Sequence, residues 1–141
     1  MTASLSSAGQ IATQIRKKEI SPVEVAHVHL DRIERLNPSL NAFVDWKPDA
    51  VLAQARAAEK AILQGEAVGP LHGVPLSIKA SIDVAGHRSE VGSRLRAGYV
   101  AAEDAPLVAR LRAAGALILA LHKMRFGCRP ATTRTNNWQR R

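Results

Sequence analysis

An apolar run at residues 116–119, Ala-Leu-Ile-Leu, constrains the possible folds of this chain more than any other segment. It directly follows a predicted helix at about 105–114, for which Asp104 is the expected N-cap and Gly115 the expected end. A helix that leads straight into a short, fully apolar strand is typical of structures in which helices pack on a sheet. The sequence therefore predicts an α/β fold.

A helix nearer the amino terminus has the clearest start signal in the chain. Residues 21–24, Ser-Pro-Val-Glu, match a capping box with proline at the first helical position, and a stripe of apolar residues comes after them. We expect this helix to span about 22–36 and to end before Pro38, because a residue that precedes proline avoids the helical region. Other helices are predicted at 7–18 and from about 48 to 63, strands at 41–45 and 74–78, and a loop at 87–103.

The composition narrows the class of protein. The 141 residues are 46% hydrophobic but include only two Trp, two Phe and one Tyr, so the core should be aliphatic. A single cysteine, Cys128, excludes an internal disulfide framework and a multi-cysteine metal site. No apolar run approaches the ~18 residues of a membrane span, and the amino terminus does not resemble a signal peptide. We therefore expect a cytoplasmic protein without a membrane segment.

The positive charge is concentrated at one end of the chain. The formal net charge is +8, and residues 122–141 contribute six of these charges and contain no acidic residue. The sequence thus divides into a body at 1–121 and a basic, divergent tail at 122–141, which we expect to be poorly ordered. Such a tail could bind nucleic acid, but a solvated tail is the favoured interpretation.

Lys79 is the most unusual candidate for a chemical role, because it closes the apolar run at 74–78. A lysine removed from water favours its neutral form and can act as a base or nucleophile. Alternatively, its stem packs while the ammonium group reaches solvent, and spacing alone favours this second interpretation. Ser77 should share a strand face with Lys79, so a Ser/Lys dyad is conceivable. Polar roles in turns or strands are the simpler interpretation of the nearby serines, Ser77, Ser81, Ser89 and Ser93.

No metal or cofactor is expected. The histidines that could be considered as ligands have no second ligand at helical or hairpin spacing: His72, His87 and His122. The glycines between residues 69 and 92 are too widely spaced for a phosphate-binding loop and lack its strand–loop–helix frame.

Three blocks in order resemble the amidase signature family. The central block is residues 69–79, Gly-Pro-Leu-His-Gly-Val-Pro-Leu-Ser-Ile-Lys, followed by Gly86 and Gly92-Ser93. The segment at 21–44 is similar to the family's amino-terminal helix and the stretch after that helix, and 104–116 is similar to its next helix–strand unit. The resemblance implies the N-terminal part of the amidase signature fold, with helices flanking a partial mixed sheet that is incomplete in this chain.

The same resemblance implies a role for Lys79. In the family, the corresponding lysine belongs to a Ser–cis-Ser–Lys triad that hydrolyses carbon–nitrogen bonds of small-molecule carboxamides. The Gly/Ser-rich signature that supplies both serines does not occur in these 141 residues, and Ala80 replaces the acid that usually comes after the lysine. We therefore expect a truncated amidase, inactive on its own, whose exposed apolar surface promotes self-association. The alternative is a non-catalytic fragment or interaction module whose basic tail binds nucleic acid.

Overall fold

The computed structural model describes residues 7–91 and 93–123. The expectation of a poorly ordered tail at 122–141 concerns residues that, from 124 onward, lie outside this part. The described elements, in chain order, are α1 (Ala8–Arg16), α2 (Pro22–Leu40), β1 (Phe43–Trp46), α3 (Pro48–Leu63), β2 (Pro75–Lys79), the 3-10 helix η2 (Arg94–Arg96), α4 (Pro106–Ala113) and β3 (Leu117–His122).

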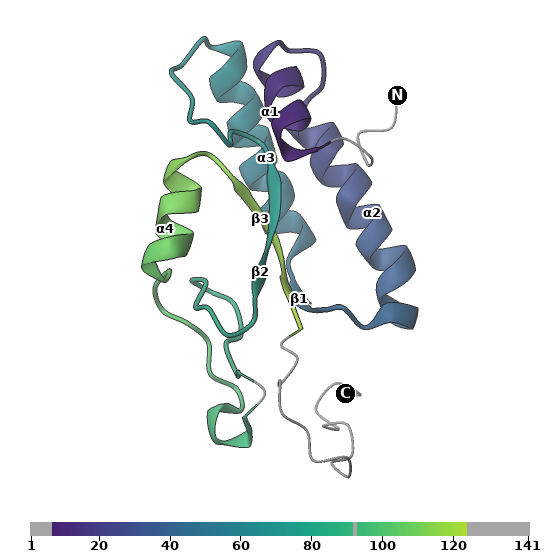
Figure 1. Cartoon of the computed structure of the whole chain (residues 1–141), viewed down its shortest axis with the longest axis vertical. Coiled ribbons are helices and arrows are strands. Elements are labelled where there is room, and N and C mark those ends of the chain that lie inside the picture. Colours follow the sequence, from purple (N-terminus) through teal and green to yellow (C-terminus); the bar gives the residue numbers. More distant parts are fainter. Residues whose placement is uncertain (1–6, 92, 124–141) are drawn as a thin grey trace.

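The described strands form a mixed sheet in the order β1-β3-β2, with the apolar strand β3 at its centre (Figure 1). Strand β2 runs parallel to β3, and β1 runs antiparallel to it. The predicted α/β fold with helices flanking a partial mixed sheet is therefore confirmed. Both outer strands have one edge without a strand partner among the described residues.

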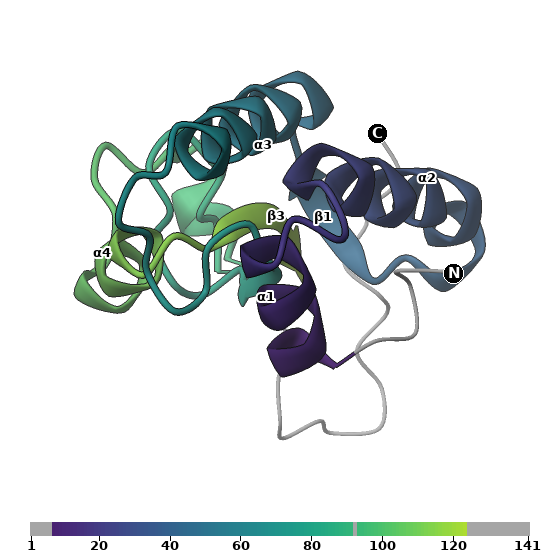
Figure 2. The same cartoon turned by 90° about the horizontal axis from the view of Figure 1, so that it is seen from above.

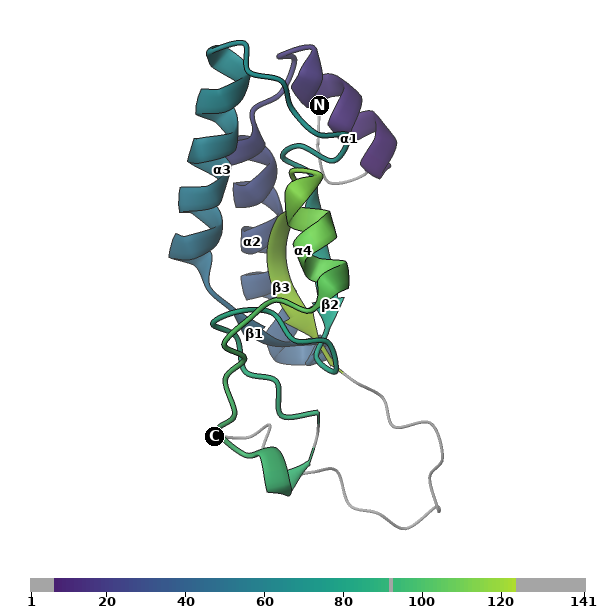
Figure 3. The same ribbon diagram turned by 90° about the vertical axis from the view of Figure 1, so that its left-hand side faces the viewer.

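Helices cover both faces of this sheet (Figures 2 and 3). Leu117, Leu119 and Ala120 of β3 pack toward α2 and α3, whereas Ile118 and Leu121 pack toward α4. Leu119 and Ala120 are neighbours on the same face because the pairing with β2 shifts at this point, which inserts one extra residue into β3. Helix α1 packs beside Val25 and Val74 in a separate apolar cluster.

The capping box predicted for α2 is present. The Ser21 hydroxyl accepts the Val23 N–H at 2.9 Å, and the Ser21 N–H donates to the Glu24 carboxylate at 3.0 Å. Helix α1 begins with a second capping box, formed by Ser7 and Gln10, that our sequence analysis did not identify. These reciprocal bonds satisfy amide donors that have no partner within their own helix.

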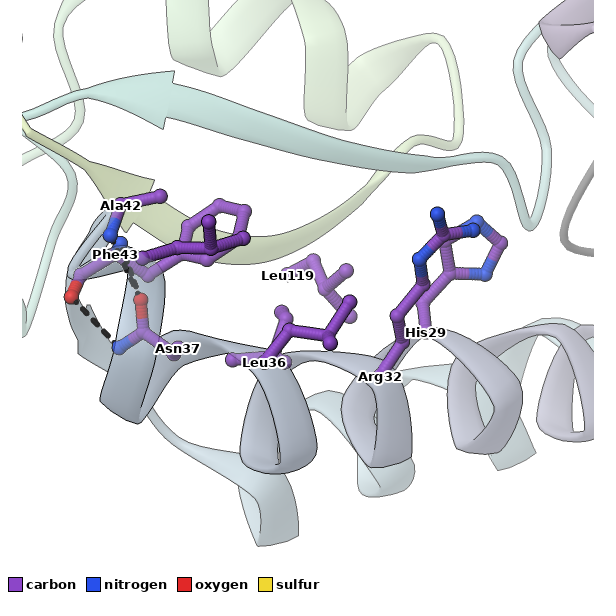
Figure 4. A pocket seen from close by; sticks show the side chains of 9 residues that line it. His29, Arg32, Leu36, Asn37, Ala42, Phe43 and Leu119 are labelled. Carbon is purple, nitrogen blue, oxygen red and sulfur yellow. Dashed lines mark hydrogen bonds between the residues drawn. The ribbon is translucent and has the colours of Figure 1, made fainter.

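The prediction that α2 ends before Pro38 is wrong, because the helix continues through Pro38 to Leu40. Proline lacks the N–H that would bond to the carbonyl four residues earlier, but so near the end of a helix the loss is confined to the last turn. Beyond the helix, the Asn37 side chain fixes the turn into β1: it accepts the N–H groups of Ala42 and Phe43 at 2.9 and 2.8 Å and donates to the Phe43 carbonyl at 3.0 Å (Figure 4). Asn41 then closes the helix with a left-handed φ of 48°.

Asp104 is not the N-cap of α4, contrary to the sequence-based expectation. Ala105 occupies that position and makes no side-chain cap. The Asp104 carboxylate instead accepts the Ala85 N–H at 2.8 Å and the Arg112 Nε–H at 2.7 Å. It therefore joins the loop after β2 to α4, which is a tertiary role that local sequence signals do not reveal.

Among the described helices, none has both the length and the apolar character needed to cross a membrane.

Candidate functional site

Lys79 is the last residue of β2 and is exposed. Ser77 is exposed as well, whereas Ile78 between them is buried in the cluster that packs toward α4. The prediction that Ser77 and Lys79 share one face of a strand is confirmed. The surface interpretation of Lys79 also describes its position here, since its ammonium group is not enclosed by the described residues.

A row of paired residues crosses the sheet at Lys79. Lys79 of β2 is in register with His122 of β3, which in turn is in register with Phe43 of β1. Residues paired in this way project their side chains from the same face of a sheet. Phe43 packs against the cluster formed with α2 and α3, so the row lies on the face that carries these two helices. Ser77 is paired with Ala120 one step back along the same face.

His122 has an unusual environment. Its Nδ1 atom is buried and has no hydrogen-bond partner among the described residues. Its carbonyl accepts the Ala80 N–H at 3.0 Å, which fixes the end of β3 beside the residue after Lys79. From the sequence, His122 was not expected to bind a metal, and no local pattern indicates that it is a neighbour of Lys79.

Two of the other serines near Lys79, Ser89 and Ser93, have structural contacts. Ser89 is completely buried, and its hydroxyl donates a hydrogen bond to the Asp83 carboxylate. Asp83 also lies 3.7 Å from the guanidinium group of Arg96, which stacks over the Tyr99 ring. The Ser93 hydroxyl accepts the N–H of Leu95 at the start of η2. These contacts hold the loop after Lys79, and they agree with the structural interpretation of Ser89 and Ser93.

A partly buried contact between Asp45 and His87 joins β1 to the same loop. The Nδ1 atom of His87 lies 3.1 Å from the Asp45 carboxylate, which also accepts the Arg88 N–H at 3.0 Å. Burial alone would raise the pKa of Asp45. The hydrogen bonds from His87 and Arg88, with the positive charges of His87 and Lys47, outweigh burial and hold this pKa below its ordinary value. The pair could not be predicted, because no local sequence pattern links residues 42 positions apart.

Close packing explains why the 69–79 block begins with glycine. A Cβ atom on Gly69 would lie 2.4 Å from the Ala114 carbonyl oxygen, so only glycine fits beside the end of α4. A Cβ atom on Gly115, whose φ is 88°, would similarly collide with His72. The ring of His72 contacts the Ala58 carbonyl through Nε2 at 2.9 Å. No cluster of three or more His, Cys, Asp or Glu side chains suited to a metal occurs in the described part.

Comparison with known proteins identifies the family of this chain. The family model described as Amidase matches residues 24–136, so the chain belongs to the amidase signature family. A glutamyl-tRNA(Gln) amidotransferase subunit of Methylococcus capsulatus is 44% identical over 110 residues, which are 78% of this chain and 22% of that protein. Indoleacetamide hydrolase of Bradyrhizobium diazoefficiens is 41% identical over 115 residues, covering 82% and 22% of the two chains.

Solved structures agree with this assignment. The peptide amidase of Stenotrophomonas maltophilia superposes with a TM-score of 0.76 at 30% identity, covering 84% of this chain and 24% of that one. A bacterial aryl acylamidase of the amidase signature family gives 0.76 at 33% identity, covering 83% and 25%. The chain therefore spans about a fifth to a quarter of the length of the relatives that it matches.

Proposed function

We propose that this chain is the amino-terminal part of an enzyme that hydrolyses the carbon–nitrogen bond of carboxamides, and that Lys79 is its proton-accepting side chain. Family membership supports the reaction class. The relatives are named for different molecules, glutamyl-tRNA(Gln), indoleacetamide, peptides and aryl acylamides. Each enzyme name refers to an amide or to the transfer of an amido group, so we propose the bond type and not a particular substrate.

In the proposed reaction, neutral Lys79 takes a proton, through the cis serine, from the nucleophilic serine that attacks the amide carbonyl. An acyl-enzyme forms, the amine or ammonia leaves, and water releases the acid. Lys79 must lose its own proton first, and an amine does so more readily when it is removed from water. Since Lys79 is exposed among the described residues, other parts of an amidase domain would have to cover it.

The position of Lys79 carries this proposal. It lies at the carboxyl end of β2, on the same face as Ser77 and next to an unpaired strand edge, so it is open to a further segment of protein. The serines of the proposed triad are not in the 141 residues, and we therefore propose that this chain alone has no hydrolase activity.

An amide-hydrolysis assay on the purified chain tests the last point. Ammonia release from indoleacetamide and from a peptide amide should not exceed that of buffer. Hydrolysis that is abolished by Lys79→Ala but retained by Lys60→Ala, an exposed lysine on α3, would contradict the claim that the chain lacks its nucleophile.

A further inference from the structure

An apolar groove lies between α2 and the sheet (Figure 4). Its volume is about 320 Å³, and the residues that form its apolar walls are Ile33, Leu36, Leu40, Phe43 and Leu119. We call it the α2 groove. A cavity of about 150 Å³ in another protein holds a benzene ring, so the α2 groove has room for a ring with a short chain attached.

The two ends of the α2 groove differ in chemical character. His29 and Arg32 lie at one end and Phe43 lies at the other, with apolar side chains between them (Figure 4). Along α2, Arg32 precedes Leu40 by eight positions, which corresponds to about 12 Å of helix. The groove is therefore a trough with a cation at one end and carbon along the rest of its length.

The polar side chains of the α2 groove favour an anion at that end. Asn37 uses its amide on the backbone of the turn into β1, and the Nδ1 atom of His29 contacts the Val25 carbonyl at 2.8 Å. None of the described residues that line the groove is acidic. Arg32 also interacts within the chain, but a guanidinium group has five N–H donors in a planar fork and keeps its charge. Charge complementarity therefore selects a negatively charged group beside Arg32.

We propose that the α2 groove binds a small monocarboxylic acid with an aromatic body, its carboxylate on Arg32 and its ring against Phe43. A guanidinium group holds a carboxylate through two parallel N–H···O bonds, and aromatic rings pack favourably against each other. The ring also removes part of Leu40, which is 66% exposed, from water. The groove does not include Lys79, so the proposal goes beyond the proposed hydrolysis, and an inactive chain leaves it intact.

Ligand-observed fluorine NMR on the full chain tests this binding, with 3-(4-fluorophenyl)propionate as the probe. The line of a small probe broadens on binding whether the protein is a monomer or an oligomer. We expect saturable broadening with a Kd below about 1 mM. The alcohol and the amine that replace the carboxylate of the probe should bind at least about tenfold more weakly. Broadening that does not saturate, or equal binding of the amine, would overturn the proposal.

Two pairs of variants, all at exposed positions, locate the bound probe. Arg32→Gln should raise the Kd at least about tenfold. Arg35→Gln makes the same charge change on α2 outside the groove and should leave the Kd unchanged. Leu40→Glu adds a carboxylate at the apolar end and should abolish binding, whereas Leu63→Glu, at an equally exposed leucine that ends α3, should not. Equal effects within either pair would overturn the assignment to the α2 groove.

A second copy of the chain is the alternative occupant of the α2 groove. If copies docked there, the apparent Kd of the probe would rise with protein concentration, because each copy would compete with the probe. We expect the same Kd at low and high protein concentration. A Kd that rises with protein concentration would show docking between copies and overturn the proposal.

Discussion

Lys79 and His122 occupy paired positions on the parallel strands β2 and β3, and the Ala80 N–H donates to the His122 carbonyl at 3.0 Å. The residue with the strongest claim to a chemical role is thus held beside the last residue of the central strand. The pair is also in register with Phe43, which packs against the apolar cluster formed with α2 and α3. Lys79, His122 and Phe43 therefore lie on one face of the sheet.

Replacing His122 by an apolar residue should not destabilise the domain. The buried Nδ1 atom of His122 has no partner among the described residues, and an unsatisfied buried polar atom costs about 1–3 kcal/mol. His122→Leu should therefore leave the free energy of unfolding unchanged or raise it by about 1 kcal/mol, as measured by urea denaturation. A decrease of more than about 1 kcal/mol would show that the imidazole makes a stabilising contact.

The Asp45–His87 pair should make stability depend on pH in the acid range. A carboxyl whose pKa is lower in the folded state contributes stability that is fully present above its unfolded pKa of about 3.9. This contribution is lost as the pH falls through the folded pKa of Asp45. Asp45→Asn should therefore be less stable than wild type at pH 7, and the difference should shrink below about pH 4.

Chemical denaturation at several pH values measures this difference. Glu103→Gln, which removes an exposed carboxylate, is the matched control and should follow the wild-type pH profile. A stability difference between wild type and Asp45→Asn that is the same at pH 3 and pH 7 would be inconsistent with a lowered Asp45 pKa.

The end of α2 should depend on Asn37. Its side chain makes three hydrogen bonds to the backbone of Ala42 and Phe43, and Asn37→Ala leaves these groups without their partners. We expect a loss of about 1–3 kcal/mol in the free energy of unfolding. Ser39→Ala removes one exposed hydrogen bond, to the Leu36 carbonyl, and should cost less than about 1 kcal/mol. Equal losses in the two variants would contradict this account of the turn.

Self-association is a further expectation, since several apolar side chains face solvent. Leu95 is 98% exposed and Leu107 is 50% exposed. Sedimentation velocity should show oligomers of the purified chain at micromolar concentration, and the double variant Leu95→Lys, Leu107→Lys should reduce them. A monodisperse monomer that melts cooperatively would refute the expectation.

Local signals predicted much of the fold because they are contained in a few neighbouring residues. The capping box at Ser21 and the proline at Pro48 correctly marked two helix starts, and the apolar run at 116–119 correctly marked the central strand. The prediction failed at Pro38 because a proline in the last turn removes only one backbone hydrogen bond, so the helix continues to Leu40.

Relationships between distant residues could not be predicted in this way. Asp104 was predicted to cap a helix but contacts Ala85 and Arg112. Asp45 contacts His87, which lies 42 positions later in the loop after β2. The pairing of Lys79 with His122 depends on the register of two strands, including the extra residue in β3. For Lys79 itself, the sequence supplied the candidate and the structure supplied its neighbours, and its catalytic role stays a prediction.

Transplantation into a complete relative tests the central claim about Lys79 most directly. Residues 24–123 of this chain would replace the matching part of the Bradyrhizobium indoleacetamide hydrolase, and kcat for indoleacetamide would be measured. We predict that this chimera is active, that Lys79→Ala lowers kcat by about 10²–10⁴-fold, and that Lys60→Ala does not change it. An active chimera whose kcat is unaffected by Lys79→Ala would contradict the account.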